Sequence, residues 1–244
     1  MKTSGHTVLI TGGATGIGFA LARALVAAGN TVAICGRRRA TLLDAKRSLP
    51  QLHIKVCDVS SPASRRSLLR WLDQRLPALN LLVNNAGIQR PFDFLKGPRD
   101  LPPANEEIRT NLAAPLHLSA LLLPRLRRRR HAAIVNISSG LGFTPLAAVP
   151  VYSATKAALH SLTLSLRHQL RGTSVRVFEI APPIVPTDLA GVRRRPSESE
   201  FTMSPDAVAA GIVAALAHDT YEVALGAAAN LHAQRDRLFE AING

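Results

Sequence analysis

The chain has 244 residues, of which 47% are hydrophobic, so it can bury a substantial core as one α/β domain over residues 1–244. Its net charge of +14 would suit nucleic acid, because Lys and Arg that neutralise phosphates supply most non-specific affinity, but no aromatic stacking platform accompanies the charge. The amino-terminal apolar runs are too short for a membrane span and MKTSGHTVLITGG lacks the features of a signal peptide, so we expect a cytoplasmic protein without membrane contact.

Short apolar, β-branched runs alternate with longer segments of helical period along most of the chain. This alternation is typical of repeated βαβ units, so we expect an α/β fold in which a doubly wound parallel sheet of about seven strands carries helices on both faces. The predicted strands are 7–11, 31–35, 53–57, 79–84, 132–138, 174–180 and a weak one at 222–225. The predicted helices are 16–29, 39–48, 62–75, 105–124, one that carries Tyr152, one begun by the capping pair Ser204 and Pro205, and a terminal helix.

The first predicted strand is followed directly by TGGATGIG, which opens into the first predicted helix. Glycines permit a tight turn and close backbone approach there, and the amino end of the helix offers N–H groups and positive potential to a pyrophosphate. The spacing of Gly12, Gly16 and Gly18 differs from the usual G-x-G-x-x-G, but strand, loop and helix occur in the order that the motif requires. We therefore predict a dinucleotide site that also includes Thr15 and Ile17.

The second predicted strand ends in CGRRR, at the corner where a carboxylate favours a ribose 2′-hydroxyl and an arginine accommodates a 2′-phosphate. Arg37, Arg38 and Arg39 stand at this corner, and no acidic residue occurs before Asp44. The alternative is that the arginines only begin a helix, where cations oppose the helix dipole. The pattern favours NADP over NAD.

Three other segments are interpreted as structural. Cys35 and Cys57 close apolar runs, so we expect small core residues rather than a disulfide or a metal site, and no His/Cys spacing resembles a zinc site. The proline-rich segment 89–104 is predicted to be a loop at the strand ends without regular structure. The run RLRRRRH at 125–131 suits a solvated helix carboxyl end, with nucleic-acid contact as the second interpretation. The general positive field could also steer anionic ligands into a cleft.

The stretch PVYSATKAAL at 150–159 places Lys156 four positions after Tyr152, one of only two tyrosines in the chain. In a helix, residues four apart lie on one face. A phenol loses its proton near pH 10, and an adjacent ammonium lowers that pKa by about 1–3 units, toward the range where an acid or base works at neutral pH. The alternative is a buried aromatic residue beside a solvated lysine.

These motifs together resemble the short-chain dehydrogenases/reductases. The resemblance covers about residues 6–190 and consists, in the family's order and spacing, of TGGATGIG, CDV, NNAG at 84–87, Asn111, SSG at 138–140, and Tyr152 with Lys156. Within the family, NTVAICGRR, NNAGIQR and SSGLGFTP are most similar to the DltE-like oxidoreductases. The resemblance implies a single-domain Rossmann fold and an NADP-dependent oxidoreductase that acts on carbonyl and alcohol groups.

The resemblance also implies the catalytic roles. Tyr152 would exchange a proton with the substrate oxygen, and Lys156 would lower the pKa of Tyr152 and hydrogen-bond the nicotinamide ribose. Ser139, rather than Ser138, would orient the substrate carbonyl or alcohol. Asn111 would hold a water in a proton relay to the lysine.

Further residues are implied to contact the cofactor. Arg37 and Arg38 would bind the 2′-phosphate of NADP, and Thr187 would hold the nicotinamide carboxamide with help from the backbone of Val185. The remaining residues would line the adenine pocket or pack along the cofactor: Asp58, Val59, Asn85, Ala86 and Gly87. One departure is Pro182 and Pro183, where the family usually has Pro-Gly. Proline fixes φ and removes an N–H donor, so we expect this loop to be stiffer or to follow a different path.

In the reductive direction, a hydride from NADPH would reach a carbonyl carbon while Tyr152 protonates the oxygen and Ser139 stabilises the developing charge. The substrate wall is predicted from the segments 89–104 and 188–203 and from Leu141, Phe143 and Leu146. These are mainly apolar, so a carbonyl compound with an apolar body is expected. Arginines at 90, 99 and 193–195 leave an acidic group on the substrate open.

Two other classes of function remain open from the sequence. A catalytically inert NADP-binding regulator would keep the glycine loop and Arg37 but would not need Ser139, Tyr152 and Lys156. A basic nucleic-acid-binding protein would explain the charge but not the glycine loop. The apolar faces of the helices at 105–124 and 152–170 are expected to associate, as in relatives of the family, into a homo-oligomer, either a dimer or a tetramer.

Overall fold

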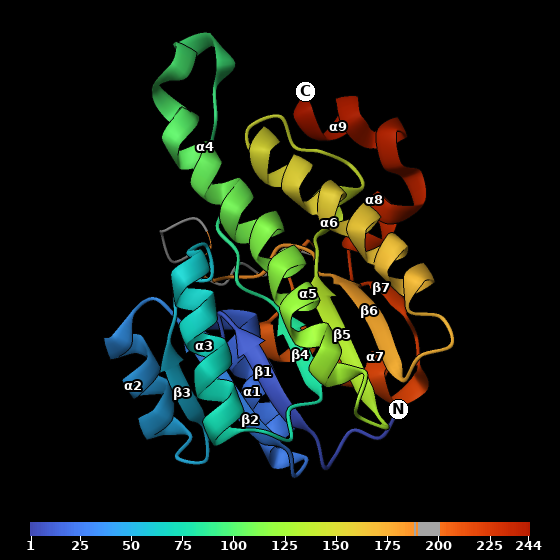
Figure 1. Cartoon of the computed structure of the whole chain (residues 1–244). Helices are drawn as coiled ribbons and strands as arrows, with labels where there is room; N and C mark the ends of the chain where they lie inside the picture. Colours follow the sequence, from blue (N-terminus) through green and yellow to red (C-terminus); the bar gives the residue numbers. More distant parts are fainter. Residues whose placement is uncertain (188, 190–200) are drawn as a thin grey trace.

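Figure 1 shows the computed structural model of the chain, which describes residues 1–187, 189 and 201–244. A seven-stranded parallel sheet forms its centre, with the strand order β3-β2-β1-β4-β5-β6-β7. The doubly wound α/β fold expected from the sequence is therefore confirmed. The strands are β1 (Thr7–Thr11), β2 (Thr31–Gly36), β3 (His53–Val56), β4 (Leu81–Asn84), β5 (Ala132–Ile137), β6 (Val175–Ala181) and β7 (Glu222–Ala224).

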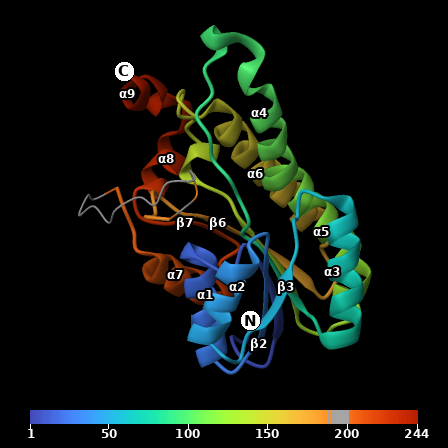
Figure 2. The same cartoon turned by 90° about the vertical axis from the view of Figure 1, so that its left-hand side faces the viewer.

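Helices cover both faces of this sheet (Figures 1 and 2). One face carries α1 (Gly16–Ala27), α2 (Arg39–Ser48) and α7 (Pro205–His218). The other face carries α3 (Pro62–Arg75), α5 (Ala114–Leu126) and α6 (Pro150–Gln169). Three further helices, α4 (Leu101–Ile108), α8 (Ala228–Gln234) and α9 (Phe239–Asn243), extend beyond the sheet at one end.

The hydrophobic core is divided between the two faces because successive strand residues point in opposite directions. Val8 and Ile10 of β1 pack in the core under α1 and α7, whereas Leu9 packs in the core under α3 and α5. All three side chains are fully buried. Apolar residues at every position of a strand are thus explained by a sheet that is covered on both sides.

The segment 89–104 was expected to lack regular structure, and this prediction is wrong for its second half. Phe94–Asp100 forms a 3-10 segment with a break at Gly97, and α4 begins at Leu101. Pro102 and Pro103 lie in the first turn of α4, where the backbone N–H groups have no intrahelical partner and proline is tolerated. The prolines therefore mark a helix start rather than a loop.

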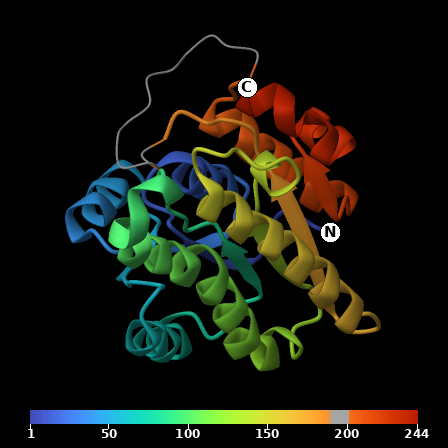
Figure 3. The same ribbon diagram turned by 90° about the horizontal axis from the view of Figure 1, so that it is seen from above.

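The helix expected at 105–124 is longer than predicted and is interrupted once. It runs from α4 through a π-type turn at Arg109–Ala113 into α5, beside α6 (Figure 3). In the π-type turn the N–H of Ala114 bonds to the carbonyl of Arg109, five residues earlier. Such turns are frequent at functional sites because they change which carbonyls the helix uses.

The two cysteines are core residues as expected, whereas two arginines of the basic run are held by neighbouring groups rather than fully solvated. Cys35 and Cys57 are buried and free. Arg125 lies in the last turn of α5 and pairs with Asp73 of α3, and Arg129 donates a hydrogen bond to the carbonyl of Pro77. Across the described residues, no helix has the length and apolarity needed to cross a membrane.

Candidate active site

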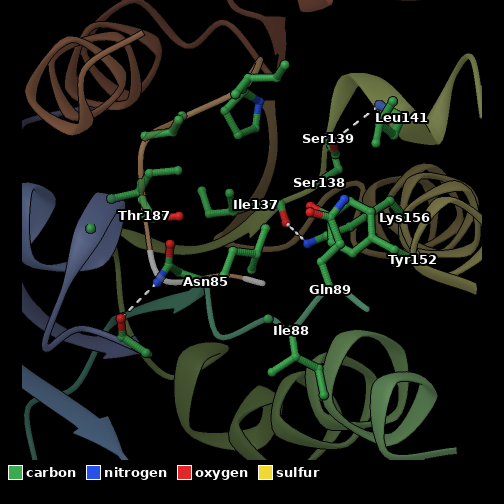
Figure 4. A pocket seen from close by; sticks show the side chains of 18 of the residues that line it. Asn85, Ile88, Gln89, Ile137, Ser138, Ser139, Leu141, Tyr152, Lys156 and Thr187 are labelled. Atoms are coloured by element: carbon green, nitrogen blue, oxygen red, sulfur yellow. Dashed lines mark hydrogen bonds between the residues drawn. The ribbon is translucent and has the colours of Figure 1, made fainter. Parts of the chain in front are cut away.

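A cavity of about 1290 Å³ opens at the carboxyl ends of the strands, where the strand order reverses between β1 and β4. This is the position at which open α/β sheets bind ligands. Apart from Gly18 and Asn111, every site residue predicted from the sequence lines this cavity. They are Gly12, Thr15, Gly16, Ile17, Arg37, Arg38, Asp58, Val59, Asn85, Ala86, Gly87, Ser139, Tyr152, Lys156, Val185 and Thr187. Several of them are shown in Figure 4.

The glycine loop brings an uncapped helix amino terminus to the cavity. Thr15 is the N-cap of α1 but makes no side-chain capping bond within the described structure, and the first turn contains no acidic residue. Its first N–H groups are therefore available to an anion. A Cβ at Gly18 would lie 2.5 Å from the carbonyl oxygen of Gly12, so only glycine lets the helix pack this closely on the loop. These features fit a pyrophosphate.

The NNAG sequence holds the ends of β1 and β4 together. Asn85 Nδ2 donates to the carbonyl oxygens of Thr11 at 2.9 Å and Gly12 at 3.1 Å. In return, Thr11 Oγ1 accepts from the backbone N–H groups of Asn85 and Ala86, each at 3.0 Å. The motif is therefore more than a turn after a strand, since it sets the position of the glycine loop.

Arg37 takes part in an ion-pair network at one end of the cavity. Its Nη1 lies 2.7 Å from Glu106 Oε1, and Arg90 Nη1 lies 2.8 Å from Glu106 Oε2. The two guanidinium groups lower the pKa of Glu106, Arg90 first. α2 also begins at this corner, with Arg38 as its N-cap. The arginines thus both begin a helix and face a ligand cavity.

At the opposite side of the cavity, α6 brings Tyr152 and Lys156 to one helix face (Figure 4). Both side chains are buried, and Lys156 Nζ lies 5.5 Å from the centre of the Tyr152 ring. Nζ donates a hydrogen bond of 2.8 Å to the carbonyl of Ile137, at the end of β5. Burial lowers the pKa of Lys156 to about 8, while Glu179 and then Glu107 oppose that shift. A solvated lysine beside a core aromatic residue does not describe this pair.

Two neighbouring serines follow β5, and their side chains differ in direction. Ser138 Oγ donates to the carbonyl of Ile180 at 3.4 Å, within the sheet. Ser139 Oγ accepts from the N–H of Leu141 at 3.2 Å and remains at the cavity with its own hydroxyl proton. This difference favours Ser139 as the serine that can contact a ligand.

Asn111 lies in the π-type turn and is almost fully buried behind the cavity wall. Its side chain accepts from the N–H of Ile88 at 2.9 Å and donates to the carbonyl of Ile88 at 2.8 Å. It also donates to Thr155 Oγ1 at 3.2 Å. Asn111 therefore ties the segment after β4 to α6, one residue before Lys156.

The Pro182–Pro183 segment keeps the residues that follow it at the cavity. The carbonyl of Pro182 accepts from the N–H of Gly140 at 3.3 Å, and both Val185 and Thr187 line the cavity. Thr187 lies close to the glycine loop, since a Cβ at Gly16 would approach its Cγ2 to 2.7 Å. The predicted wall residues at 188 and 190–200 lie outside the described residues, as do the arginines at 193–195 and the side chain of Arg99.

The sequence reasoning missed one wall of the cavity. Leu141 and Leu146 line it as expected, but Phe143 instead packs edge-on between the rings of His160 and His232. The missed wall belongs to the segment from Gly226 onward, and its apolar members are Ala227, Ala228, Leu231, Leu238 and Ile242. The only indication of this wall in the sequence is the spacing of apolar residues in the predicted terminal helix. The sequence does not show what that helix packs against.

Comparisons with known proteins give a consistent result. Residues 6–198 match the family model described as short chain dehydrogenase. Uncharacterized oxidoreductase DltE of Bacillus subtilis is 55% identical over 189 residues, which are 78% of this chain and 75% of that protein. NADP-dependent 3-hydroxy acid dehydrogenase YdfG of Escherichia coli K12 is 34% identical over 188 residues, covering 76% and 75% of the two chains.

A solved structure supports the same fold. A short chain dehydrogenase/reductase from Burkholderia phymatum, in complex with NAD, superposes with a TM-score of 0.87 at 22% identity. The match covers 100% of this chain and 97% of that chain. Together with the 55% identity to DltE, the comparisons confirm the family and the DltE-like subgroup that the motifs resembled.

The contact between Gly16 and Thr187 generates a first prediction. We expect Gly16→Ala to lower the free energy of unfolding by more than Gly29→Ala does. Both glycines have positive φ, which should disfavour alanine by about 1–2 kcal/mol at either position. The added Cβ meets Thr187 Cγ2 at Gly16, whereas at Gly29 it meets no described atom within 4 Å. Urea unfolding measures both variants.

Thr187→Ser removes the methyl group that meets the added Cβ. Combined with Gly16→Ala, it should therefore recover the excess loss of stability and leave only the part that Gly29→Ala also shows. Equal losses for the two single alanine variants would contradict this account of the loop.

Proposed function

Because this chain belongs to the short-chain dehydrogenase family, we propose that it is an NADP(H)-dependent oxidoreductase that transfers a hydride between the nicotinamide and a carbonyl or alcohol substrate. One observation carries the proposal. Tyr152, Lys156 and Ser139 face the same cavity as the uncapped amino terminus of α1. A protein that only bound the cofactor would not need Tyr152, Lys156 and Ser139 together beside the cofactor site.

The chain's own residues would handle the proton and the charge on the substrate oxygen. When bound, the nicotinamide supplies or accepts the hydride. Tyr152 gives a proton to the substrate oxygen in reduction and removes it in oxidation. The hydroxyl of Ser139 donates a hydrogen bond to the same oxygen and stabilises its developing charge. Lys156, as an ammonium, favours the phenolate form of its neighbour.

NADP, rather than NAD, is the cofactor that we propose. Arg37 lines the cavity where the second strand ends, and no acidic residue follows that strand before Asp44, so the sequence places no carboxylate directly after β2 to bind a 2′-hydroxyl. The relative YdfG is described as NADP-dependent. Arg37 would have to exchange its contact with Glu106 for the 2′-phosphate, a substitution of one anion for another.

The substrate that we propose is a carbonyl or alcohol compound with an apolar body. Near Tyr152 the wall is formed by Leu141 and Leu146, and the segment from Gly226 onward contributes Leu231, Leu238 and Ile242. Such a surface favours the burial of hydrocarbon. Arg90 also lines the cavity, but Glu106 already pairs with its guanidinium, which weakens the case for an acidic substrate group.

We also propose that the chain forms a homo-oligomer through α5 and α6. Leu116 and Leu121 of α5 and Leu164 of α6 are each more than 40% exposed. Light scattering should give a mass that is two or four times 26.1 kDa. A Leu164→Asp variant should shift the mass toward that of one chain, because a charge opposes burial in an apolar interface. A 26.1 kDa species for the unmodified protein would contradict the proposal.

The proposed function is tested by a screen of carbonyls and alcohols, followed by the absorbance of the reduced nicotinamide, with Tyr152→Phe as the deciding variant. We expect kcat to fall by about 10²–10⁴-fold, the contribution of a positioned acid or base, with NADPH affinity retained. Normal turnover by the variant would rule out Tyr152 as the proton carrier. NADPH binding without turnover of any compound by the unmodified protein would favour an inert regulator.

Cofactor preference is tested at Arg37. Arg37→Ser should weaken NADPH binding by about 10- to 100-fold, the value of charged hydrogen bonds to phosphate, and leave NADH binding unchanged. Glu106→Gln should act in the other direction and tighten NADPH binding by up to about fivefold, because it releases an exposed ion pair. Fluorescence titration measures the affinities, and Arg47→Ser, on the outer side of α2, is the matched control. A preference of the unmodified protein for NADH would overturn the argument.

A further inference from the structure

Glu107 is a buried carboxylic acid that none of the roles above uses. It lies in the last turn of α4 and is only 1% exposed. Among the described residues, its Oε1 has no hydrogen-bond partner. An unpaired polar atom in such a position is costly, so it calls for an explanation.

The position of Glu107 connects it with the proposed catalytic centre. Glu107 precedes Asn111 by four residues along the continuous helix that α4 forms with its π-type turn. The segment after β4 runs along this helix: Ile88 exchanges two hydrogen bonds with Asn111, and the backbone amide of Arg90 interacts with the Glu107 carboxylate. Gly87 lies beside both Asn111 and Lys156, because a Cβ atom added to Gly87 would be 3.5 Å from Asn111 Oδ1 and 3.8 Å from Lys156 Nζ. The two glutamates of α4 thus differ, because Glu106 pairs with exposed arginines while Glu107 points inward.

Among the described residues, two charged groups act on Glu107. Arg90 faces it from the segment after β4, and Lys156 faces it from α6. Lys156 also interacts with Glu179 of β6, a fully buried carboxylate whose Oε2 is 2.8 Å from His160 Nδ1. Tyr152 is a further titratable neighbour of Lys156. Burial raises the pKa of Glu107 to about 7, against the opposing effects of Arg90 and Lys156. Glu107 can therefore exchange a proton at neutral pH.

On the premise of the proposed oxidoreductase function, we propose that Glu107 is the acid that resupplies Lys156 with a proton during reduction and accepts that proton during oxidation. The family resemblance assigned the relay only as far as Asn111 and a water. Glu107 adds a titratable group at the end of that path. It acts through Lys156 and does not touch the substrate, so it is a positioning and proton-exchange residue.

The proton balance in reduction is simple. The O–H bond of Tyr152 breaks as the substrate oxygen takes the proton, and the phenolate then receives a proton from the Lys156 ammonium. The neutral amine receives a proton from the carboxylic acid of Glu107 through water, because no direct hydrogen bond joins the two groups among the described residues. The Glu107 carboxylate then takes a proton from solvent that enters through the cavity, whose wall includes Arg90 and Thr110 near Glu107 in the chain. One solvent proton is consumed for each hydride transferred, and oxidation reverses every step.

Glu179 is the other buried acid near Lys156, and its Oε1 also lacks a hydrogen-bond partner among the described residues, but the contact of its Oε2 suits a different role. It already shares a hydrogen bond with His160, and it lies within the sheet, paired in register with Asn136 and Glu222. It serves as a fixed counter-charge to the lysine. Glu107 instead lies outside the sheet, on α4, a helix that extends beyond the sheet (Figure 1).

The experiment compares pH profiles of kcat for the reductive reaction in the unmodified protein and in Glu107→Gln. Reduction needs protonated Glu107, so the unmodified protein should lose rate as the pH rises through about 7. In the variant, kcat should not show this decrease near pH 7, the limb of the profile that we assign to Glu107. Below that pH, its kcat should be lower than that of the unmodified protein by about 10²-fold, the lower end of what a positioned proton donor contributes. Glu107→Asp should restore the limb. A uniform loss at all pH values, with the limb retained, would indicate a merely structural role and overturn the inference.

A second measurement does not depend on turnover. In the protein without cofactor, ¹³C NMR of the glutamate carboxyl groups should show one group that titrates near pH 7 and disappears in Glu107→Gln but not in Glu106→Gln. Stability should fall as the pH rises from about 4.5 to about 7, because the folded state holds a proton that the unfolded chain has released. Glu107→Gln should remove that slope.

The outcomes separate the two proposals. If the unmodified enzyme is active, Tyr152→Phe is inactive and Glu107→Gln keeps the full pH profile, the inference fails and the proposed function stands. If the unmodified protein turns over no carbonyl or alcohol, both fail. If the NMR titration is absent, Glu107 is not the proton-exchange group.

Discussion

The burial of the Lys156 ammonium is the constraint on which the rest of the site depends. A charged amine inside a protein is unfavourable unless nearby groups compensate it, and the low pKa of about 8 reflects that penalty. The compensation comes from separate elements: the carbonyl of Ile137 at the end of β5, Glu179 of β6 and Glu107 of α4. The sheet, α6 and the helix that leads into α5 must therefore be assembled before this lysine can be accommodated beside Tyr152.

Around the glycine loop, the structure of the cavity depends on close packing of the backbone. Glycine at position 18 lets α1 meet the loop after β1, and Asn85 holds that loop to the end of β4. The amino terminus of α1 is then left uncapped at the cavity. Helix N–H groups without a side-chain cap are suited to an anion that arrives with the cofactor.

α4 connects the two ends of the cavity through adjacent glutamates. Glu106 links Arg37 to Arg90 on the outer side, while Glu107 faces Lys156 on the inner side. Under the proposals above, a cofactor phosphate that takes Arg37 away from Glu106 would act on the same helix that carries the proton-exchange acid. The positive charge of the chain has other uses as well, since Arg125 and Arg129 tie the end of α5 to the end of α3.

The sequence by itself determined the doubly wound sheet, because its strand and helix periods are local and regular and the central strands are apolar on both faces. It also predicted the glycine loop, Asn85, Ser139, Tyr152 and Lys156 as a set, because their residue types and spacing are specific, and the structure brings them to one cavity. It did not determine the helical start at Leu101, since the prolines there are compatible with either a loop or a first helical turn. Only the tertiary structure decided which side chains share the buried space. In the sequence, nothing distinguishes Glu107 from other glutamates of a predicted helix. Nor does anything distinguish Leu231, Leu238 and Ile242 from the apolar residues of an ordinary terminal helix. Their roles arise from neighbours far away in the chain, and contacts of that kind leave no local pattern.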